Sequence, residues 1–478
     1  MKSFFRKVAF GIGPNENVPS DPLKWALGQL DDVPDLAWKG RMHSEKVMRE
    51  KYSREWRVQE SKLRKKYKDN KTLYKTQKDL LRHKTGQRFW ESLEISIRHT
   101  EAIQSQSPVL AKLWFFWANH FAIVDKDFLP KYHTGPYQRE SIRLNLNQTF
   151  EKLVYDATTS WAMIRNLDNS QNVGPKSKSA GEEWRRRKKE PATINENHAR
   201  ELLELHTVSP NSGYTQEDII QLAYIMTGWQ HKHDKKKLET ANVWFNQKHH
   251  QRGKKNVLGK TYKSGKKGLA AVIKDLVNHP SCREFVANRL CTHFITDEPT
   301  KEMKAPIIKA FKDSDGYLPE IHKAAIKVIF EQNKKYKKFQ TPENWFIQLA
   351  KISDLQWPPS KTLMDLYELE KKPIRSQREP EWLLKRIGNH PYRAKQPNGY
   401  VDLEDEWLSP ELIIRRLAVA RRFPEMSNSK LIYDNEFFEN VIISNFDEPS
   451  KLLNLMKTPT TYSDRFVIFA NSPEVMRS

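Results

Sequence analysis

The chain has 478 residues, enough for one large domain or for two or three ordinary ones. Its 14 Trp and 22 Phe exclude a disordered chain, because large aromatic residues supply burial that disordered chains lack. Lysine and arginine outnumber aspartate and glutamate by 82 to 59, and the net charge of +23 favours either a solvated basic surface or contact with polyanions.

Hydrophobic periodicity predicts helices along most of the chain. Residues 1–42 are expected to be loop-rich, because Gly11, Gly13 and Pro14 break regular structure. A flexible segment is expected at 170–192, where no apolar periodicity is visible. The predicted helices cover residues 43–69, 72–104, 107–123, two stretches within 137–168, 195–206, 215–229, 266–279, 281–295, 302–313, 318–332, 342–354, 409–422, 434–444 and 448–456.

Strand signals are limited to short pieces at 243–245 and 256–258, too few for a sheet-based fold. We therefore predict an all-α protein, a large irregular multi-helix bundle with long loops and few or no strands. The predicted organisation is a loop-rich segment over 1–42, a helical core that carries the site over 43–340, and a C-terminal helical region over 341–478 packed on that core.

Hydropathy and cysteine content indicate the cellular compartment in which the protein is expected. No apolar run reaches the roughly 18 residues of a membrane span, and the longest, 113–124, is interrupted by Asn119 and His120. No A-x-A-like cleavage site follows the N-terminus, which favours a cytoplasmic protein. Cys282 and Cys291 would lie about 13.5 Å apart on one helix, too far for a disulfide, so both are expected to be reduced.

The most informative stretch is the polar helix over 195–206. A helical wheel of about 100° per residue separates a polar arc from an apolar side. The polar arc contains Glu196, Asn197, Arg200, Glu201 and Glu204, and the apolar side contains Leu202, Leu203 and Leu205, with His198 and His206 among them.

Two carboxylates on adjacent turns allow several kinds of chemistry. Glu201 and Glu204 are an i, i+3 pair and can share a proton, bind a divalent cation or hold a cationic partner. The alternative is a solvated face whose ion pairs only support the helix. His120 has two readings as well, because a histidine on an apolar helix is more often a satisfied core residue than a metal ligand.

Several strings, taken together and in order, resemble one bacterial family, the domain of unknown function 1800 (DUF1800). The resemblance extends from about residue 4 to about residue 423, and the longest string is Asn-Glu-Asn-x-Ala-Arg-Glu-x-x-Glu-Leu-His over 195–206. The other strings are 5–11, 116–121, 162–163 with 167–169, 213–215 with Asp218, 227–229, His250 with Gly253, Lys255, Leu258 and Gly259, 279–280, and 397–400 with Trp407.

The resemblance implies a helical bacterial protein. Members often carry an export signal, and they are often encoded beside a second family similar to sulfatases and alkaline phosphatases. This chain departs from the pattern in lacking an evident export signal and in having Gln251 where the family has an aspartate after the loop histidine. The charged insertions near 43–85 and 175–190 are also unusual for the family.

The leading hypothesis is an enzyme with a buried carboxylate and histidine site that acts on an anionic or polymeric substrate. In its divalent-metal form, Glu201 would be a base and Arg200 an anion clamp. The expected site gathers His120, Asp168, Asn169, Glu196, Arg200, Glu201, Glu204 and His250. The catalytic set would be Asp168, Arg200, Glu201 and Glu204, and the metal ligands would be His120, Glu196, Glu204 and His250.

Two other classes stay open. One is a polyanion-binding or nucleic-acid-binding module whose basic runs are 185–189, 235–237, 254–255 and 334–338. The other is a non-catalytic partner of a sulfatase-like or alkaline-phosphatase-like protein.

Overall fold

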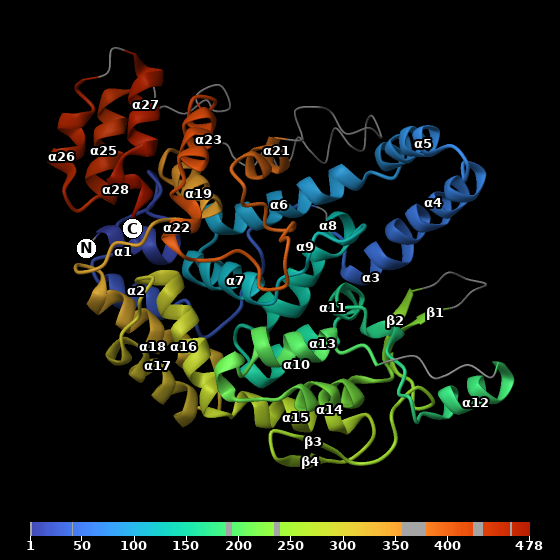
Figure 1. Cartoon of the computed structure of the whole chain (residues 1–478). Coiled ribbons are helices and arrows are strands. Elements are labelled where there is room, and N and C mark those ends of the chain that lie inside the picture. The colour runs from blue at the N-terminus through green and yellow to red at the C-terminus, as the bar shows by residue number, and fades with distance from the viewer. Residues whose placement is uncertain are drawn as a thin grey trace.

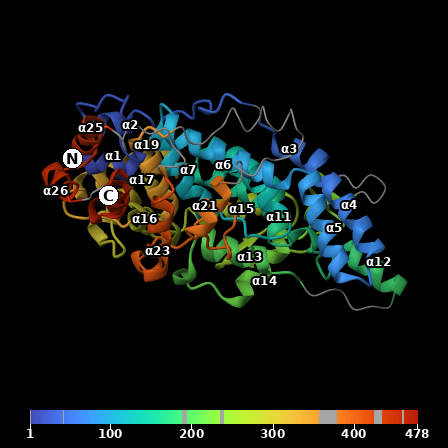
Figure 2. The same ribbon diagram turned by 90° about the horizontal axis from the view of Figure 1, so that it is seen from above.

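The computed structural model describes residues 2–40, 42–187, 194–233, 240–355, 379–423, 434–458 and 461–478. These residues form a mostly helical protein (Figures 1 and 2), which confirms the predicted all-α class. Two antiparallel hairpins interrupt the helices: β1 (Trp229–His233) pairs with β2 (Thr240–Phe245), and β3 (Lys255–Val257) pairs with β4 (Lys260–Tyr262). No helix within the described ranges is long and apolar enough to cross a membrane.

The larger of two hydrophobic clusters surrounds α7 (Pro108–His120). Every residue of α7 except Asn119 is buried, as expected for a helix that is apolar on all sides. The other helices that contribute to this cluster or pack around it are α1 (Lys2–Ala9), α2 (Pro22–Leu27), α6 (Gln87–Gln104), α8 (Leu129–Tyr132), α9 (Thr134–Tyr137), α10 (Phe150–Thr159), α11 (Trp161–Asn166), α14 (Gln216–Met226), α15 (Lys267–Val277), α16 (Pro280–Phe294), α17 (Lys301–Asp313) and α18 (Leu318–Gln332).

The second hydrophobic cluster is formed mainly by residues after 338, and α6 contributes Ile95 to it. The predicted domain boundaries at 42 and 340 stay a prediction. The first and last helices lie close together (Figure 1), and the Arg6 guanidinium donates to the carbonyls of Asn445, Glu474 and Arg477. The C-terminal helices are α19 (Pro342–Ile352), α21 (Glu379–Arg386), α22 (Glu404–Trp407), α23 (Pro410–Ala420), α25 (Asn435–Asn445), α26 (Pro449–Leu455), α27 (Tyr462–Asn471) and α28 (Pro473–Met476).

A charged helical hairpin forms one end of the molecule (Figures 1 and 2). The short α3 (Glu45–Val47) and the π-helical turn η1 (Met48–Ser53) lead into α4 (Arg54–Lys66), and α5 (Lys71–Lys84) packs against α4. The structure divides the predicted helix over 72–104 into α5 and α6. The break is at Gly86, whose left-handed φ of 67° interrupts the helical backbone just before α6 begins.

Two expectations about elements are corrected. The segment 170–192 contains α12 (Lys178–Arg187), a helix of mostly charged residues that has no apolar stripe to reveal it. The predicted helices stop at 456, yet α27 and α28 follow, each preceded by a serine or threonine at the N-cap. Within residues 1–42, expected to be loop-rich, the described helices are α1 and α2, and the other described residues lie outside helices. Helix α1 is almost entirely buried.

Candidate functional site

The polar helix is shorter and less regular than predicted. It consists of α13 (Asn197–Glu201) and the π-helical turn η5 (Leu202–His206). In an α-helix, residues 198 and 206 would be separated by about 80° around the axis. A π-turn rotates less per residue, which brings His206 closer to the side of His198, and both histidines are buried.

The polar arc faces outward and is half-buried. Glu196 accepts from the Arg200 guanidinium at 2.5 Å, and Gln216 bonds to both side chains. Glu204 accepts from the Tyr214 hydroxyl at 3.1 Å. Burial, and then the neighbouring Glu204, raise the pKa of Glu201 above its usual value. The structure therefore brings Glu196, Arg200, Glu201 and Glu204 together on one face.

Asp168 and Asn169 lie at the start of the polar helix. Asp168 has a left-handed φ of 58° and forms an ion pair with Lys126 at 2.6 Å. The Asn169 amide donates to the carbonyls of Met226 and Trp229. The two Asn169 bonds hold its loop against the end of α14 and the start of β1.

His250 lies in a separate hydrogen-bonded group. Its Nδ1 lies 2.9 Å from the Thr227 carbonyl, and its Nε2 accepts from the Gly265 amide at 2.9 Å. The neighbouring Gln251 accepts from the Lys176 amide and donates its own amide to the Thr227 hydroxyl. Both side chains therefore hold loops together, and a reactive role for His250 would have to compete with these bonds.

His120 lies at the inner side of the polar helix. Its Nε2 donates to the His206 carbonyl at 3.2 Å, so the lone pair of the neutral ring is on Nδ1. The expected ligands thus fall into different groups: Glu196 and Glu204 on the outer face, His120 inside, and His250 at Thr227. Among the residues that the structure describes, no group of three or more His, Cys, Asp or Glu side chains is placed to hold a metal ion. The four expected ligands therefore do not lie together, and the metal form stays a prediction.

Helix α16 brings further polar groups to His120. On α16, Phe285, Arg289 and His293 follow one another at intervals of four residues and therefore share a face. The Phe285 ring lies 6.0 Å from that of His120, and the His293 ring lies 5.3 Å from that of Phe116. Since Phe116 and His120 are one turn apart on α7, the two stripes run antiparallel and Arg289 lies between the two ring contacts.

A histidine and an aspartate form a buried pair beside this stripe. His293 Nδ1 lies 2.7 Å from Asp402 Oδ1, and each side chain is 8% exposed. Burial alone would raise the pKa of Asp402, but His293 and then Arg289 lower it below its usual value. His293 Nε2 is buried and has no hydrogen-bond partner within the described parts of the chain. Both residues line a cavity of about 40 Å³.

The motif strings 116–121 and 397–400 meet at the same cavity. The Asn119 amide donates to the Tyr400 carbonyl at 2.7 Å, and the Tyr400 amide donates to Asn119 Oδ1 at 2.8 Å. Gly399 comes so close that a Cβ atom there would lie 2.4 Å from the Asn119 carbonyl oxygen. We call this region the buried centre; it comprises Asn119, His120, His206, Arg289, His293, Tyr400 and Asp402.

Sequence reasoning identified part of the buried centre. It singled out Asn119, His120, His206 and Tyr400 as members of motif strings, but it missed Arg289, His293 and Asp402. His293 and Asp402 are separated by 109 residues, and no spacing rule connects them. The sequence signal for them is weak: Arg289 and His293 share one face of α16 with Phe285, and Asp402 follows the 397–400 string by two residues.

A family model described as "Protein of unknown function (DUF1800)" matches residues 4–474. No curated protein and no solved structure was found to match the chain.

Proposed function

The chain belongs to the DUF1800 family, and on that premise we propose that it is an acid–base enzyme whose general base is His293 in the buried centre. The observation that carries this proposal is the His293–Asp402 pair at 2.7 Å, which leaves His293 Nε2 without a partner among the described residues and lines a small cavity. A buried histidine oriented by a carboxylate is a recurrent general base in enzymes.

The tautomer of His293 supports this role. Because Nδ1 donates its hydrogen to Asp402, the lone pair of the neutral ring is on Nε2. The cavity of about 40 Å³ beside it can hold a water molecule, whose share of liquid volume is about 30 Å³. His293 would take a proton from that water as its oxygen attacks the substrate, and would then return the proton to the leaving group. Asp402 would stabilise the imidazolium formed between the two steps.

The remaining groups of the buried centre fit a positioning role. The reciprocal bonds between Asn119 and Tyr400 fix the 397–402 loop, and that loop carries Asp402. Glu201 and Glu204 on the polar arc stay a second proposal for an acid–base pair, supported by the raised pKa of Glu201. Either pair is compatible with an anionic substrate. Either pair is also compatible with the sulfatase-like partner that the resemblance implies.

The test is hydrolysis of p-nitrophenyl phosphate, sulfate and acetate by the full chain and by His293→Gln. We expect the wild type to turn over at least one substrate and the variant to be about 100- to 10,000-fold slower, which is the usual contribution of a general base. His133→Gln is the matched control, because His133 is also buried and pairs through Nδ1 with a carboxylate, Glu45, but neither residue lines the cavity beside His293. Equal rates for His293→Gln and wild type, or no turnover of any substrate, would contradict the proposal.

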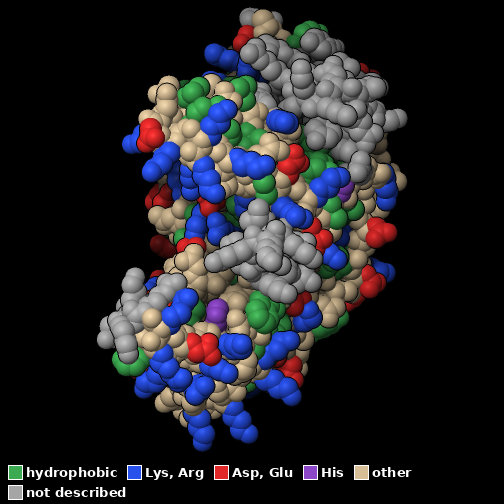
Figure 3. Space-filling model, turned by 90° about the vertical axis from the view of Figure 1, so that its right-hand side faces the viewer, with side chains coloured by type: hydrophobic (Ala, Val, Ile, Leu, Met, Phe, Trp, Pro, Cys, Tyr) green, Lys and Arg blue, Asp and Glu red, His purple; other side chains and the backbone are tan. Residues whose placement is uncertain are grey.

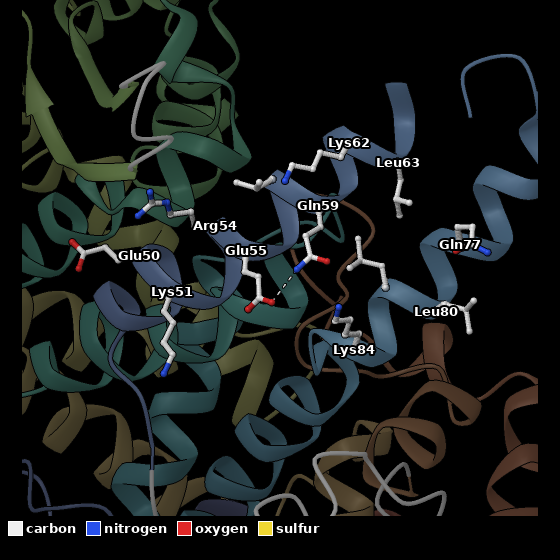
Figure 4. A pocket seen from close by; sticks show the side chains of 12 residues that line it. Glu50, Lys51, Arg54, Glu55, Gln59, Lys62, Leu63, Gln77, Leu80 and Lys84 are labelled. Carbon is white, nitrogen blue, oxygen red and sulfur yellow. Dashed lines mark hydrogen bonds between the residues drawn. The ribbon is translucent and has the colours of Figure 1, made fainter. Parts of the chain in front are cut away.

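The α4–α5 hairpin supports nucleic-acid binding as a second candidate function. Residues 45–84 contain 15 Lys and Arg against 6 Asp and Glu. Lys and Arg side chains are spread densely over the face in Figure 3, which is the end of the molecule that carries this hairpin. A groove of about 860 Å³ lies between the helices. Figure 4 shows Lys51, Arg54, Lys62 and Lys84 along it, together with Glu50, Glu55 and the leucines Leu63 and Leu80. Such a surface attracts phosphate backbones.

Fluorescence anisotropy with a labelled DNA duplex and a labelled single-stranded RNA tests the second candidate. We expect binding that weakens steeply between about 50 and 200 mM salt, and a further large loss when Lys62, Lys65 and Lys66 are changed to Glu. The control changes Lys301, Lys309 and Lys312 on α17 to Glu, which alters the net charge equally at a site away from the hairpin. Equal weakening by both triple variants would indicate only a general charge effect and would refute a role for the hairpin.

A further inference from the structure

Arg289 is the least satisfied charged side chain of the buried centre. Its Nε and Nη2 atoms are buried, and they have no hydrogen-bond partner in the part of the chain that the structure describes. Burial lowers the pKa of Arg289, and Asp402 acts in the opposite direction. Buried N–H groups without acceptors are destabilising, so those of Arg289 favour the binding of an acceptor group from outside the chain.

Three histidines in the region of Arg289 also have buried nitrogens without hydrogen-bond partners among the described residues. The rings of His198 and His206 are buried with both nitrogens unpartnered within the described ranges, and so is His120 Nδ1. The nearby carboxylate, Asp402, already accepts from His293. Each neutral histidine offers one N–H donor and one lone pair, whereas Arg289 offers several donors in a planar fork and no acceptor, so donors outnumber acceptors in this cluster. The missing partner is therefore a group rich in acceptor oxygens.

A pocket of about 610 Å³ lies next to this cluster. Phe285 belongs both to the pocket wall and to the stripe, where its ring contacts that of His120. The wall also contains Ser209, Arg283 and Lys304, and its carboxylate, Glu284, is paired with Lys304. Ser209 follows His206 closely and has a φ of 63° and ψ of 165°, a strained conformation of the kind found at ligand sites.

We propose that Arg289, together with His206 and His120, binds the tetrahedral oxyanion group of a substrate, a phosphate or sulfate, which enters from this pocket. The guanidinium would donate to two of its oxygens in the fork geometry that suits such groups. His206 would donate a third bond, and His120 Nδ1 would accept from a protonated ligand oxygen. The inference rests on the proposed function only in calling this group part of the substrate, since binding itself needs no turnover.

Isothermal titration calorimetry with inorganic phosphate and, separately, with sulfate tests the proposal on the full chain at constant ionic strength. We expect one ion of at least one kind to bind per chain with a Kd of about 1 mM or tighter. The substitution Arg289→Gln should weaken that binding at least tenfold, and His206→Asn should weaken it less. A crystal soaked in selenate, whose anomalous signal locates it, should show the ion at the Arg289 guanidinium.

The matched control is Arg416→Gln. Arg416 is fully buried and, like Arg289, has two guanidinium nitrogens without a partner among the described residues, but it donates to the Gln340 carbonyl and packs on Phe339 and Trp345, away from the buried centre. This variant should bind the anion as the wild type does. If Arg289→Gln does not fold, the anion affinity of His206→Asn and the position of selenate in the crystal test the proposal instead. Unchanged affinity in Arg289→Gln, binding only elsewhere on the basic surface, or no binding at about 10 mM would overturn the proposal. Anion binding with unchanged turnover in His293→Gln would instead refute the proposed function alone.

Discussion

At the residue scale, the geometry of the buried centre depends on one glycine. Gly399 has a φ of 73°, and a Cβ atom there would overlap the Asn119 carbonyl. Gly213 has a similar φ of 76° but open space around it, so it isolates the cost of the left-handed backbone. We expect Gly213→Ala to cost about 1–2 kcal/mol in free energy of unfolding and Gly399→Ala to cost clearly more. Urea denaturation measures both, and equal costs would mean that the close approach is unimportant.

Sequence reasoning at this scale identified side chains better than it placed them. The wheel of the polar helix put His198 and His206 on the inner side, and both are buried. It could not show that His206 lies near His120 and Arg289, because Arg289 is 83 residues further along the chain and its position depends on how α7 packs against α16. The carboxylates of the arc and the histidines thus lie on opposite sides of one helix.

At the element scale, a buried ion pair ties α6 to α19. The Arg98 guanidinium bonds to both oxygens of Glu343, and His99 adds a third contact. Burial alone would raise the pKa of Glu343, but Arg98 and His99 lower it to about 2. The Arg98–Glu343 pair therefore stabilises the fold fully above the pKa of an unfolded glutamate, about 4.3. This stabilisation is lost as the pH falls from there through about 2.

A substitution of Glu343 tests how much this ion pair stabilises the fold. Glu343→Gln leaves Arg98 without its counter-charge, so we expect a loss of about 3–5 kcal/mol in free energy of unfolding at pH 7. The difference from wild type should shrink as the pH is lowered from 5 to 3. Thermal unfolding across this range measures it. A difference that stays constant with pH would show that the ionised carboxylate is not what stabilises the fold.

Elements with an apolar stripe could be predicted, and those without one could not. Residues 215–229, 266–279, 281–295 and 318–332 were expected to be helical, and α14, α15, α16 and α18 lie there within a few residues. The charged α12 gave no such signal. The π-turn η5 was not predicted either. A π-turn changes the rotation per residue around the helix axis, and the hydrophobic spacing of five residues is too short to reveal that change.

At the scale of the whole molecule, α1 joins the two ends of the chain. Arg6 donates to three carbonyls of the C-terminal helices, and Phe4 and Val8 lie in the larger hydrophobic cluster. Arg6→Met would leave those carbonyls without their donor, and we expect a loss of about 3 kcal/mol. Limited proteolysis should then release the region after 434 sooner than in the wild type. An unchanged cleavage pattern would mean that the C-terminal helices are held without α1.

The central claim is that the buried centre, rather than the outward polar arc, is where the chemistry takes place. The most direct measurement is the turnover of the best p-nitrophenyl substrate by Asp402→Asn and by Glu201→Gln, each compared with wild type. We predict a loss of about 100-fold or more for Asp402→Asn, because His293 would lose the carboxylate that orients it, and a change of only a few-fold for Glu201→Gln. A large loss in Glu201→Gln together with near-normal turnover in Asp402→Asn would contradict the claim and return the site to the polar arc.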